Sequence, residues 1–166
     1  MPTWMRLRAL TAALLSACAA LEPPELRPGM DTAAVQRQLG AVTARYPLTA
    51  ALTRLEFASG PYGRTTWMVD VDGGGRVVTA RQVLTEAHFA DFQQRATGMT
   101  RAELLRTLGR PGERRGAGLR GGEVWSWRYP TNDCLWFEAT VGDDAIVRDS
   151  GYGIDPRCDA PSDARD

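Results

Sequence analysis

The sequence predicts an α+β fold of two tandem repeats, each a short helix followed by an antiparallel meander of strands. Three observations favour this prediction. A Gly-Met…Leu-Gly pattern occurs twice, 69 residues apart. Each occurrence carries the signals that begin and end a helix. Each is followed by alternating apolar stretches and glycine-rich turns. Two copies of one unit favour a paired binding surface over a catalytic pocket.

The two copies align without a gap at this offset. The alignment covers the helix signals and continues into the strands. It therefore indicates a repeated unit and not merely two helices with the same capping residues. The matched positions are Gly29 and Gly98, Met30 and Met99, Asp31 and Thr100, Val35 and Leu104, Leu39-Gly40 and Leu108-Gly109, Trp67 and Trp136, Gly73 and Gly142, and Val77-Val78 and Ile146-Val147.

The second copy has a complete set of helix signals. Thr100 stands at the N-cap with Glu103 three residues later, which is the spacing of a capping box. Met99 and Leu104 have the spacing of a hydrophobic staple. Gly109 then supplies the left-handed residue that ends a helix. The first copy keeps the cap, as Asp31, and lacks the glutamate.

Each helix is expected to lead into strands. In the first copy we expect strands at 55–57, 67–72 and 76–79, with a tight reversal at 73–75. In the second copy, Val124–Tyr129 alternates with three aromatic residues on one face. Further strands are expected at 135–141 and 145–147, joined by a turn at 142–144. A lead-in helix around Thr85–Phe92 precedes the second copy.

The N-terminus indicates export. Arg6 and Arg8 precede an apolar stretch, Ala9–Ala17, that is too short to span a bilayer. It ends in Leu15-Ser16-Ala17-Cys18, which resembles the lipobox of bacterial lipoproteins. The resemblance implies cleavage before Cys18 and lipidation of its thiol. Because residue 19 is not Asp, it also implies the outer membrane. The alternative is an ordinary secretory signal with an incidental cysteine.

These signals divide the chain into five parts. The two repeats together have the length of one compact domain. The predicted parts are a signal peptide (1–17), a Pro-rich tether (18–27), a divergent first repeat (28–79), a second repeat (80–152) and a partly disordered tail (153–166).

Charge and cysteine content narrow the function classes. All basic residues are arginines; without Arg6 and Arg8 they number 18 against 20 acidic residues, which does not fit a nucleic-acid binder. With Cys18 lipidated, Cys134 and Cys158 remain as an even pair in an oxidising compartment. A disulfide between them would contribute about 3 kcal/mol in the chain-entropy model. The alternative is two free thiols.

Several short stretches resemble cofactor-binding, metal-binding or catalytic motifs, but their surroundings do not fit those sites. Residues 116–121 read GxGxxG, but a strand follows where a dinucleotide site needs a helix. Asp70–Gly73 begins like a calcium loop and has Arg81 where the bidentate Glu should stand. His88 could pair with Asp91, yet no nucleophile can be placed beside them. We therefore expect no catalytic site, no metal, no cofactor and no enzyme activity.

The aromatic residues of the second copy are candidates for an interface. Trp125, Trp127 and Tyr129 share one strand face, and Trp136 lies on a strand that is apolar on both faces. Such a strand needs two covers. One is the helix pair, and the other is either the first repeat or a partner protein. Core packing accounts for most of these rings, and one or two are candidate interface anchors.

These residues also carry a family resemblance. Gly98–Leu104, Leu108–Pro111 and Trp125–Tyr129, with the lead-in helix Arg81–Phe89, resemble the SmpA/OmlA (BamE-like) outer-membrane lipoprotein domain. Residues 28–79 resemble it more weakly, as a second copy. The tandem arrangement is also similar to that of the β-lactamase inhibitor protein.

The resemblance implies a lipid-anchored, periplasm-facing outer-membrane protein that binds a periplasmic or outer-membrane protein and supports β-barrel assembly or envelope integrity. The alternative is an inhibitor-like or sensor lipoprotein that binds another periplasmic protein. This chain differs from the family pattern in two ways. The family has one such domain where this chain has two copies, and Glu22-Pro23-Pro24 stands where the first copy would have a lead-in helix. No partner-binding residue is carried over.

Overall fold

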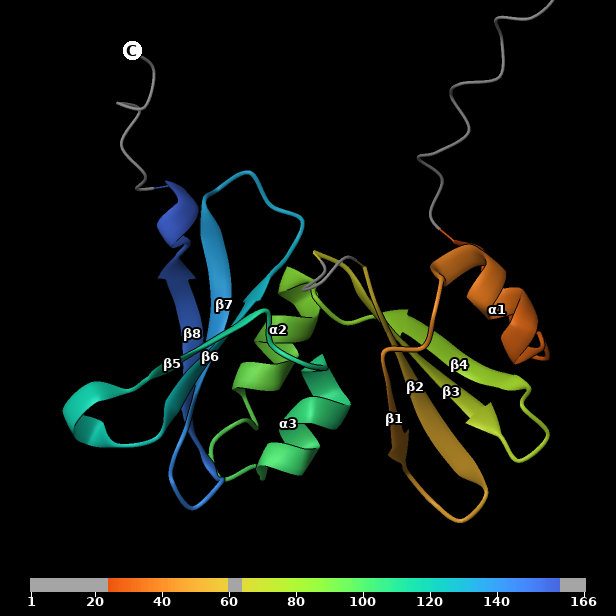
Figure 1. Ribbon diagram of the computed structural model, residues 1–166, viewed down its shortest axis with the longest axis horizontal. Helices are drawn as coiled ribbons and strands as arrows, with labels where there is room; N and C mark the ends of the chain where they lie inside the picture. The colour runs from red at the N-terminus through yellow and green to blue at the C-terminus, as the bar shows by residue number, and fades with distance from the viewer. Residues whose placement is uncertain (1–23, 60–63, 159–166) are drawn as a thin grey trace, which may run out of the picture.

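The computed structural model describes residues 24–59 and 64–158, which form two four-stranded antiparallel sheets and three short helices (Figure 1). The predictions for the signal peptide, Cys18, most of the tether and residues 159–166 lie outside the described residues. The first sheet has the order β1-β2-β3-β4 and the second β5-β6-β7-β8. The elements are α1 (Thr32–Leu39), β1 (Ala44–Pro47), β2 (Leu52–Ala58), β3 (Thr66–Asp72), β4 (Val77–Gln82), α2 (Glu86–Gln93), α3 (Arg101–Leu108), β5 (Glu113–Gly116), η1 (Gly118–Arg120), β6 (Glu123–Arg128), β7 (Leu135–Val141), β8 (Val147–Ile154) and η2 (Pro156–Cys158).

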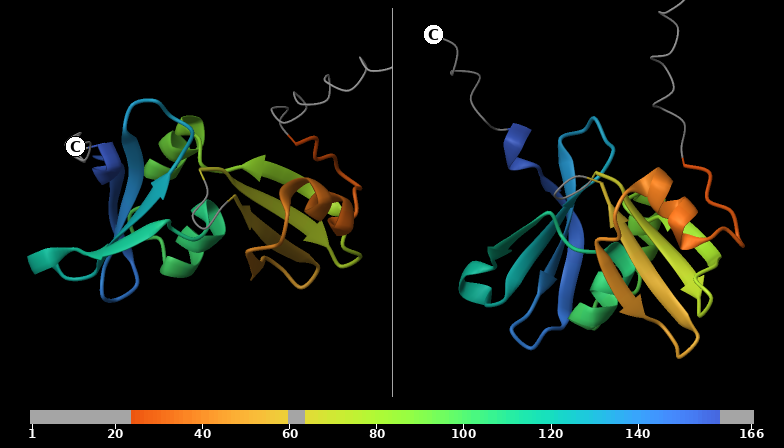
Figure 2. Two further views of the ribbon diagram at one scale, coloured as in Figure 1. Left: turned by 45° about the horizontal axis from the view of Figure 1, so that its top comes forward. Right: turned by 45° about the vertical axis from the view of Figure 1, so that its right-hand side comes forward.

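The helices and sheets lie in layers. Figures 1 and 2 show α2 and α3 between the two sheets, with α1 on the far side of the first sheet. One apolar cluster joins Val35 of α1 to the first sheet. A larger cluster joins α2 and α3 to the second sheet and includes Met68 of the first. Both faces of the first sheet are therefore covered, whereas the helices cover one face of the second.

The predicted helix signals act as expected. Thr100 and Glu103 form the capping box that begins α3, and the Asp31 side chain accepts a hydrogen bond from the Ala34 amide at the start of α1. Gly109 and Gly40 end these helices with positive φ angles of 80° and 86°. The cap residues thus explain where the helices begin and end.

The predicted α+β fold class, with two helix-plus-meander repeats, is wrong. The described chain is mostly β, because each of the three α-helices has only eight residues and the strands together hold about twice as many residues as these helices. The strand expected at 55–57 extends over Leu52–Ala58, and the one expected to end at residue 147 begins there and runs to Ile154. Two edge strands, β1 and β5, were not predicted. The clear capping signals belong to the helices, which are the smaller part of the fold.

The ungapped alignment of the two halves is also wrong in the strands. The Gly29 amide donates to the Val77 carbonyl, and in the same arrangement the Gly98 amide donates to that of Val147. The helix positions are thus 69 residues apart and the strand positions 70. The second half has one more residue in its first hairpin. Residues 48–52 connect the paired Pro47 and Thr53 in the first half, and the longer segment 117–122 connects the paired Gly116 and Glu123 in the second.

The two halves meet at the C-terminal end of α3. Glu56 of β2 is fully buried and accepts hydrogen bonds from the Tyr46 hydroxyl (2.6 Å) and the Arg110 amide (3.1 Å). Arg54 pairs with Asp70 at 2.6 and 2.8 Å and donates to the Arg106 carbonyl of α3 at 2.8 Å. We call this group of contacts the seam. It fixes the first sheet to the helices of the second half.

Candidate functional surfaces

Three of the four candidate interface aromatics face inward. Trp125, Trp127 and Tyr129 are buried in the cluster between the second sheet and α2 and α3, with exposed fractions of 1 to 3%. The Trp127 indole donates to the Gly109 carbonyl at 3.2 Å, and Phe89 of α2 meets Tyr129 edge to face. For these three rings, core packing is the alternative that the structure supports.

Trp136 lies on the opposite face of the second sheet. Its neighbours along β7, Phe137 and Leu135, belong to the inner cluster, so alternation turns Trp136 outward. It is nevertheless only 2% exposed, because the Arg128 guanidinium lies over its ring at 4.9 Å. Its indole Nε1 is buried and has no hydrogen-bond partner within the described residues. A buried donor without a partner costs about 1–3 kcal/mol.

Around Trp136 a ladder of charged side chains covers what we call the outer face, the side of the second sheet turned away from α2 and α3. Register places Ser126 beside Glu138 and Arg128 beside Trp136. Glu138 accepts from Arg115 at 2.6 Å and from Ser126 at 3.2 Å. No helix or strand within the described ranges lies on this face (Figures 1 and 2). Side chains of the sheet itself shield it.

Two glycines of β8 form part of the outer face. Gly151 pairs with Glu138, and a Cβ atom placed on Gly151 would meet no atom within 4 Å. A Cβ atom on Gly153 would lie 2.7 Å from Glu138 Oε2 and 2.9 Å from the Trp136 Nε1. Glycine is thus required at 153 for these two side chains to lie against the sheet, while the surface above Gly151 is open.

The end of β8 is tied down by a disulfide. Cys134 and Cys158 are bonded, with a Cα–Cα distance of 5.9 Å, and both residues are exposed. Between them, the Asp155 carboxylate pairs with Arg128 at 2.6 and 2.8 Å. The hydrogen bonds from Arg128 hold the pKa of Asp155 below its usual value. The disulfide segment therefore positions the carboxylate that holds Arg128 above Trp136.

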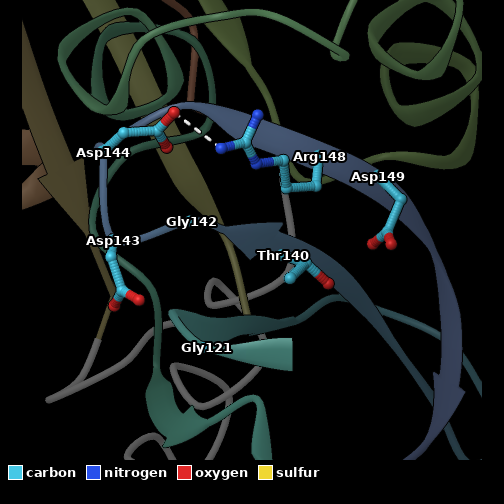
Figure 3. A pocket seen from close by; sticks show the side chains of 7 residues that line it. All are labelled: Gly121, Thr140, Gly142, Asp143, Asp144, Arg148 and Asp149. Atoms are coloured by element: carbon cyan, nitrogen blue, oxygen red, sulfur yellow. Dashed lines mark hydrogen bonds and ion pairs between the residues drawn. The ribbon is translucent and has the colours of Figure 1, made fainter. Parts of the chain in front are cut away.

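Two shallow pockets lie at opposite ends of the second sheet. The acidic pocket has a volume of about 300 Å³ at the β7–β8 turn, and Figure 3 shows Asp143, Asp144, Asp149 and Arg148 around it. Arg148 pairs with Asp144 at 2.6 Å. Within the described ranges, no three His, Cys, Asp or Glu side chains are placed to hold a metal ion.

The second pocket, which we call the basic pocket, has a volume of about 280 Å³ beside the disulfide. Its charged lining consists of three arginines and one carboxylate, contributed by the first half, by β6 and by the segment after β8. The polar lining includes Arg64, Arg128, Thr131, Asp155 and Arg157.

His88 lies apart from both pockets, at the start of α2. Burial lowers its pKa below the usual value, and the nearby Arg81 and Arg95 act in the same direction. The backbone of Thr107 and the carboxylate of Asp91 oppose this shift. The imidazole Nε2 has no hydrogen-bond partner among the described residues. His88 therefore belongs to the packing between α2 and α3.

Sequence reasoning missed the polar residues of the outer face and the basic pocket. Arg128 stands in the predicted aromatic strand, but its partner Asp155 is 27 residues away, in the segment assigned to the tail. Glu138 lies in a strand singled out for its apolar residues. The one usable signal was the predicted disulfide, which implied that residues near Cys158 return to the sheet.

No family model matches the chain, and no curated protein is significantly similar to it. Among solved structures, the chain is similar to a cysteine-rich secretory protein from Staphylococcus aureus subsp. aureus Mu50, with 10% sequence identity and a TM-score of 0.29. The match covers 78% of this chain and 45% of that one, so the chain spans less than half of its length. At this TM-score the likeness carries no argument about fold or function.

In the part of the chain that the structure describes, no helix is long and apolar enough to cross a membrane.

Proposed function

We propose that this chain is a lipid-anchored, non-catalytic protein-binding module of the bacterial outer membrane. It faces the periplasm and supports β-barrel assembly by binding a protein partner on the outer face of its second sheet. The N-terminal lipobox and the resemblance to the SmpA/OmlA domain support the anchor and the cellular role. The unequal covering of the two sheets supports the place of binding.

The observation that carries the binding site is that no described helix or strand covers the outer face, beneath which the buried Trp136 indole has no partner among the described residues. Within the described residues, the outer face is shielded by its own charged side chains, whereas the corresponding face of the first sheet is covered by α2 and α3. A buried donor without a partner costs free energy, and a hydrogen bond formed with a bound protein would remove that cost. Glycine at 151 gives a partner's backbone room for close approach.

The site of binding is tested by a bulky substitution on the open glycine. Gly151→Arg places a long side chain above the outer face, where a Cβ atom meets nothing. Gly73→Arg is the matched control, because Gly73 is equally open and lies in the β3–β4 turn. Native lipoprotein is crosslinked in intact envelopes and captured. We expect barrel-assembly components with the wild type and Gly73→Arg, and their loss with Gly151→Arg.

Other outcomes decide between the remaining alternatives. Capture of a different periplasmic protein that is also lost with Gly151→Arg would support the inhibitor-like or sensor role. A set of captured proteins that Gly151→Arg leaves unchanged would contradict binding on the outer face. The anchor is tested separately with Cys18→Ala, which should release the protein from the membrane fraction. Unchanged membrane partition would rule out lipidation at Cys18.

A further inference from the structure

Among the described residues, the basic pocket carries more positive than negative charge. Arg64, Arg128 and Arg157 line it together with Asp155, and a second carboxylate, that of Glu113, lies 3.6 Å from Arg128. The acidic pocket at the other end of the same sheet has the opposite balance, with three aspartates against Arg148. The two pockets are similar in volume, so the difference between them is one of charge and not of size.

Several guanidinium donors in the basic pocket are free. Arg128 uses Nε and Nη2 on Asp155, and its Nη1 makes no hydrogen bond within the described residues. The Arg157 side chain likewise has no partner there, although its backbone amide donates to Asp155 at 3.1 Å. Arg64 reaches the Thr131 carbonyl through Nη2 at 3.3 Å. Donors from three separate segments thus remain available at one pocket.

The surrounding contacts hold the Arg128 donor in place before any ligand binds. The Cys134–Cys158 disulfide closes the segment, and the Asp155 amide donates to the Cys134 carbonyl at 2.8 Å. The Arg128 side chain is only 12% exposed and is held by two hydrogen bonds to Asp155. Side chains ordered in advance lose less entropy on binding, which raises the affinity for a ligand that fits.

We infer that the basic pocket binds a small oxyanion, a phosphate or a carboxylate, between Arg157, Arg64 and the free Nη1 of Arg128. Planar guanidinium groups match the geometry of both anions and bind them through charge-assisted hydrogen bonds. The volume of about 280 Å³ admits a small anion and excludes a large ligand. This inference goes beyond the proposed protein-binding role and rests on different residues.

The inference is tested by titrating the purified full-length protein with inorganic phosphate and, separately, with acetate. Chloride keeps the ionic strength constant, and two-dimensional NMR follows the indole signal of Trp136, which lies beneath Arg128. We expect saturable shifts with at least one of the two anions. The more tightly bound anion identifies the preferred ligand class.

Matched arginine variants locate the site. Arg157→Gln removes an exposed guanidinium and should weaken binding about tenfold, the effect of losing one charge-assisted hydrogen bond of about 1.4 kcal/mol. Arg64→Gln provides a second, independent variant. Arg148→Gln, at the acidic pocket, should leave the affinity unchanged. Absence of saturation with both anions, or equal weakening by Arg148→Gln, would overturn the inference.

Discussion

The two sheets have a similar strand order but handle their polar faces in opposite ways. In the first sheet, Glu56 is fully buried and reaches across the seam to Arg110. In the second sheet the corresponding position is Ser126, whose hydroxyl donates a hydrogen bond to Glu138 of its own sheet. The polar groups of the first sheet therefore join the two halves of the chain. Those of the second sheet bond to one another on one surface, and no described helix lies on that surface.

The largest expected effect comes from this pair of positions. Glu56→Ala leaves the Tyr46 hydroxyl and the Arg110 amide without their acceptor, so it should lower the free energy of unfolding by about 3 kcal/mol. Ser126→Ala removes one hydrogen bond on the outer face and should cost about 1 kcal/mol or less. Urea unfolding measures both values. Equal losses would show that the seam is no more important to stability than the outer face.

The two glycines of β8 allow a crowded and an open position on the outer face to be compared. Gly153→Ala brings a Cβ atom within 3 Å of Glu138 and Trp136, and overpacking of this kind costs about 1–3 kcal/mol. Gly151→Ala meets open space and should change stability by less than about 0.5 kcal/mol. Thermal unfolding followed by circular dichroism compares the variants. A similar shift in both would contradict the packing of Trp136 and Glu138 over Gly153.

The two faces of the second sheet can be compared through their tryptophans. Trp127→Phe removes the indole that donates to the Gly109 carbonyl, whereas Trp136→Phe removes an indole whose N–H has no partner in the described part of the chain. Both changes lose similar apolar volume. We expect Trp127→Phe to destabilise the protein more, by about 1 kcal/mol. If Trp136→Phe is the more costly change, its indole has a partner in solution.

The smallest effect concerns pH and depends on α2, which has no counterpart among the described residues of the first half. Burial lowers the pKa of His88, so near pH 6.5 the unfolded chain binds a proton that the folded chain does not. The contribution to stability is therefore complete above pH 6.5 and falls as the pH is lowered from there. His88→Asn should reduce the loss of unfolding free energy between pH 7.5 and pH 5.5. An unchanged loss would show that other groups cause it.

The sequence predicted the local parts of this fold better than the long-range ones. Helix caps act within four residues, so Asp31 and Thr100 correctly marked the starts of α1 and α3. Alternation identified most of β3 and β6, since each has one face in an apolar cluster, and a run of apolar residues identified β7. These signals depend only on neighbouring residues.

The strands that were missed lack such signals. All four residues of β5 are exposed, so they show no alternation, and β8 contains two glycines, which are unfavourable in strands. The partners of the seam could not be predicted either, because Glu56 and Arg110 are 54 residues apart. The position of Trp136 under Arg128 likewise depends on Asp155, which follows β8.

The central claim is that the outer face binds a protein partner while the first half of the molecule serves to hold the fold. Site-specific photo-crosslinking in intact envelopes tests it most directly. A photoreactive residue is placed at Arg115, which is half-exposed on the outer face, and in a second protein at Arg37, in the last turn of α1. We predict a crosslinked partner from position 115 and none from position 37. Crosslinks from position 37 alone, or equal crosslinks from both, would contradict the claim.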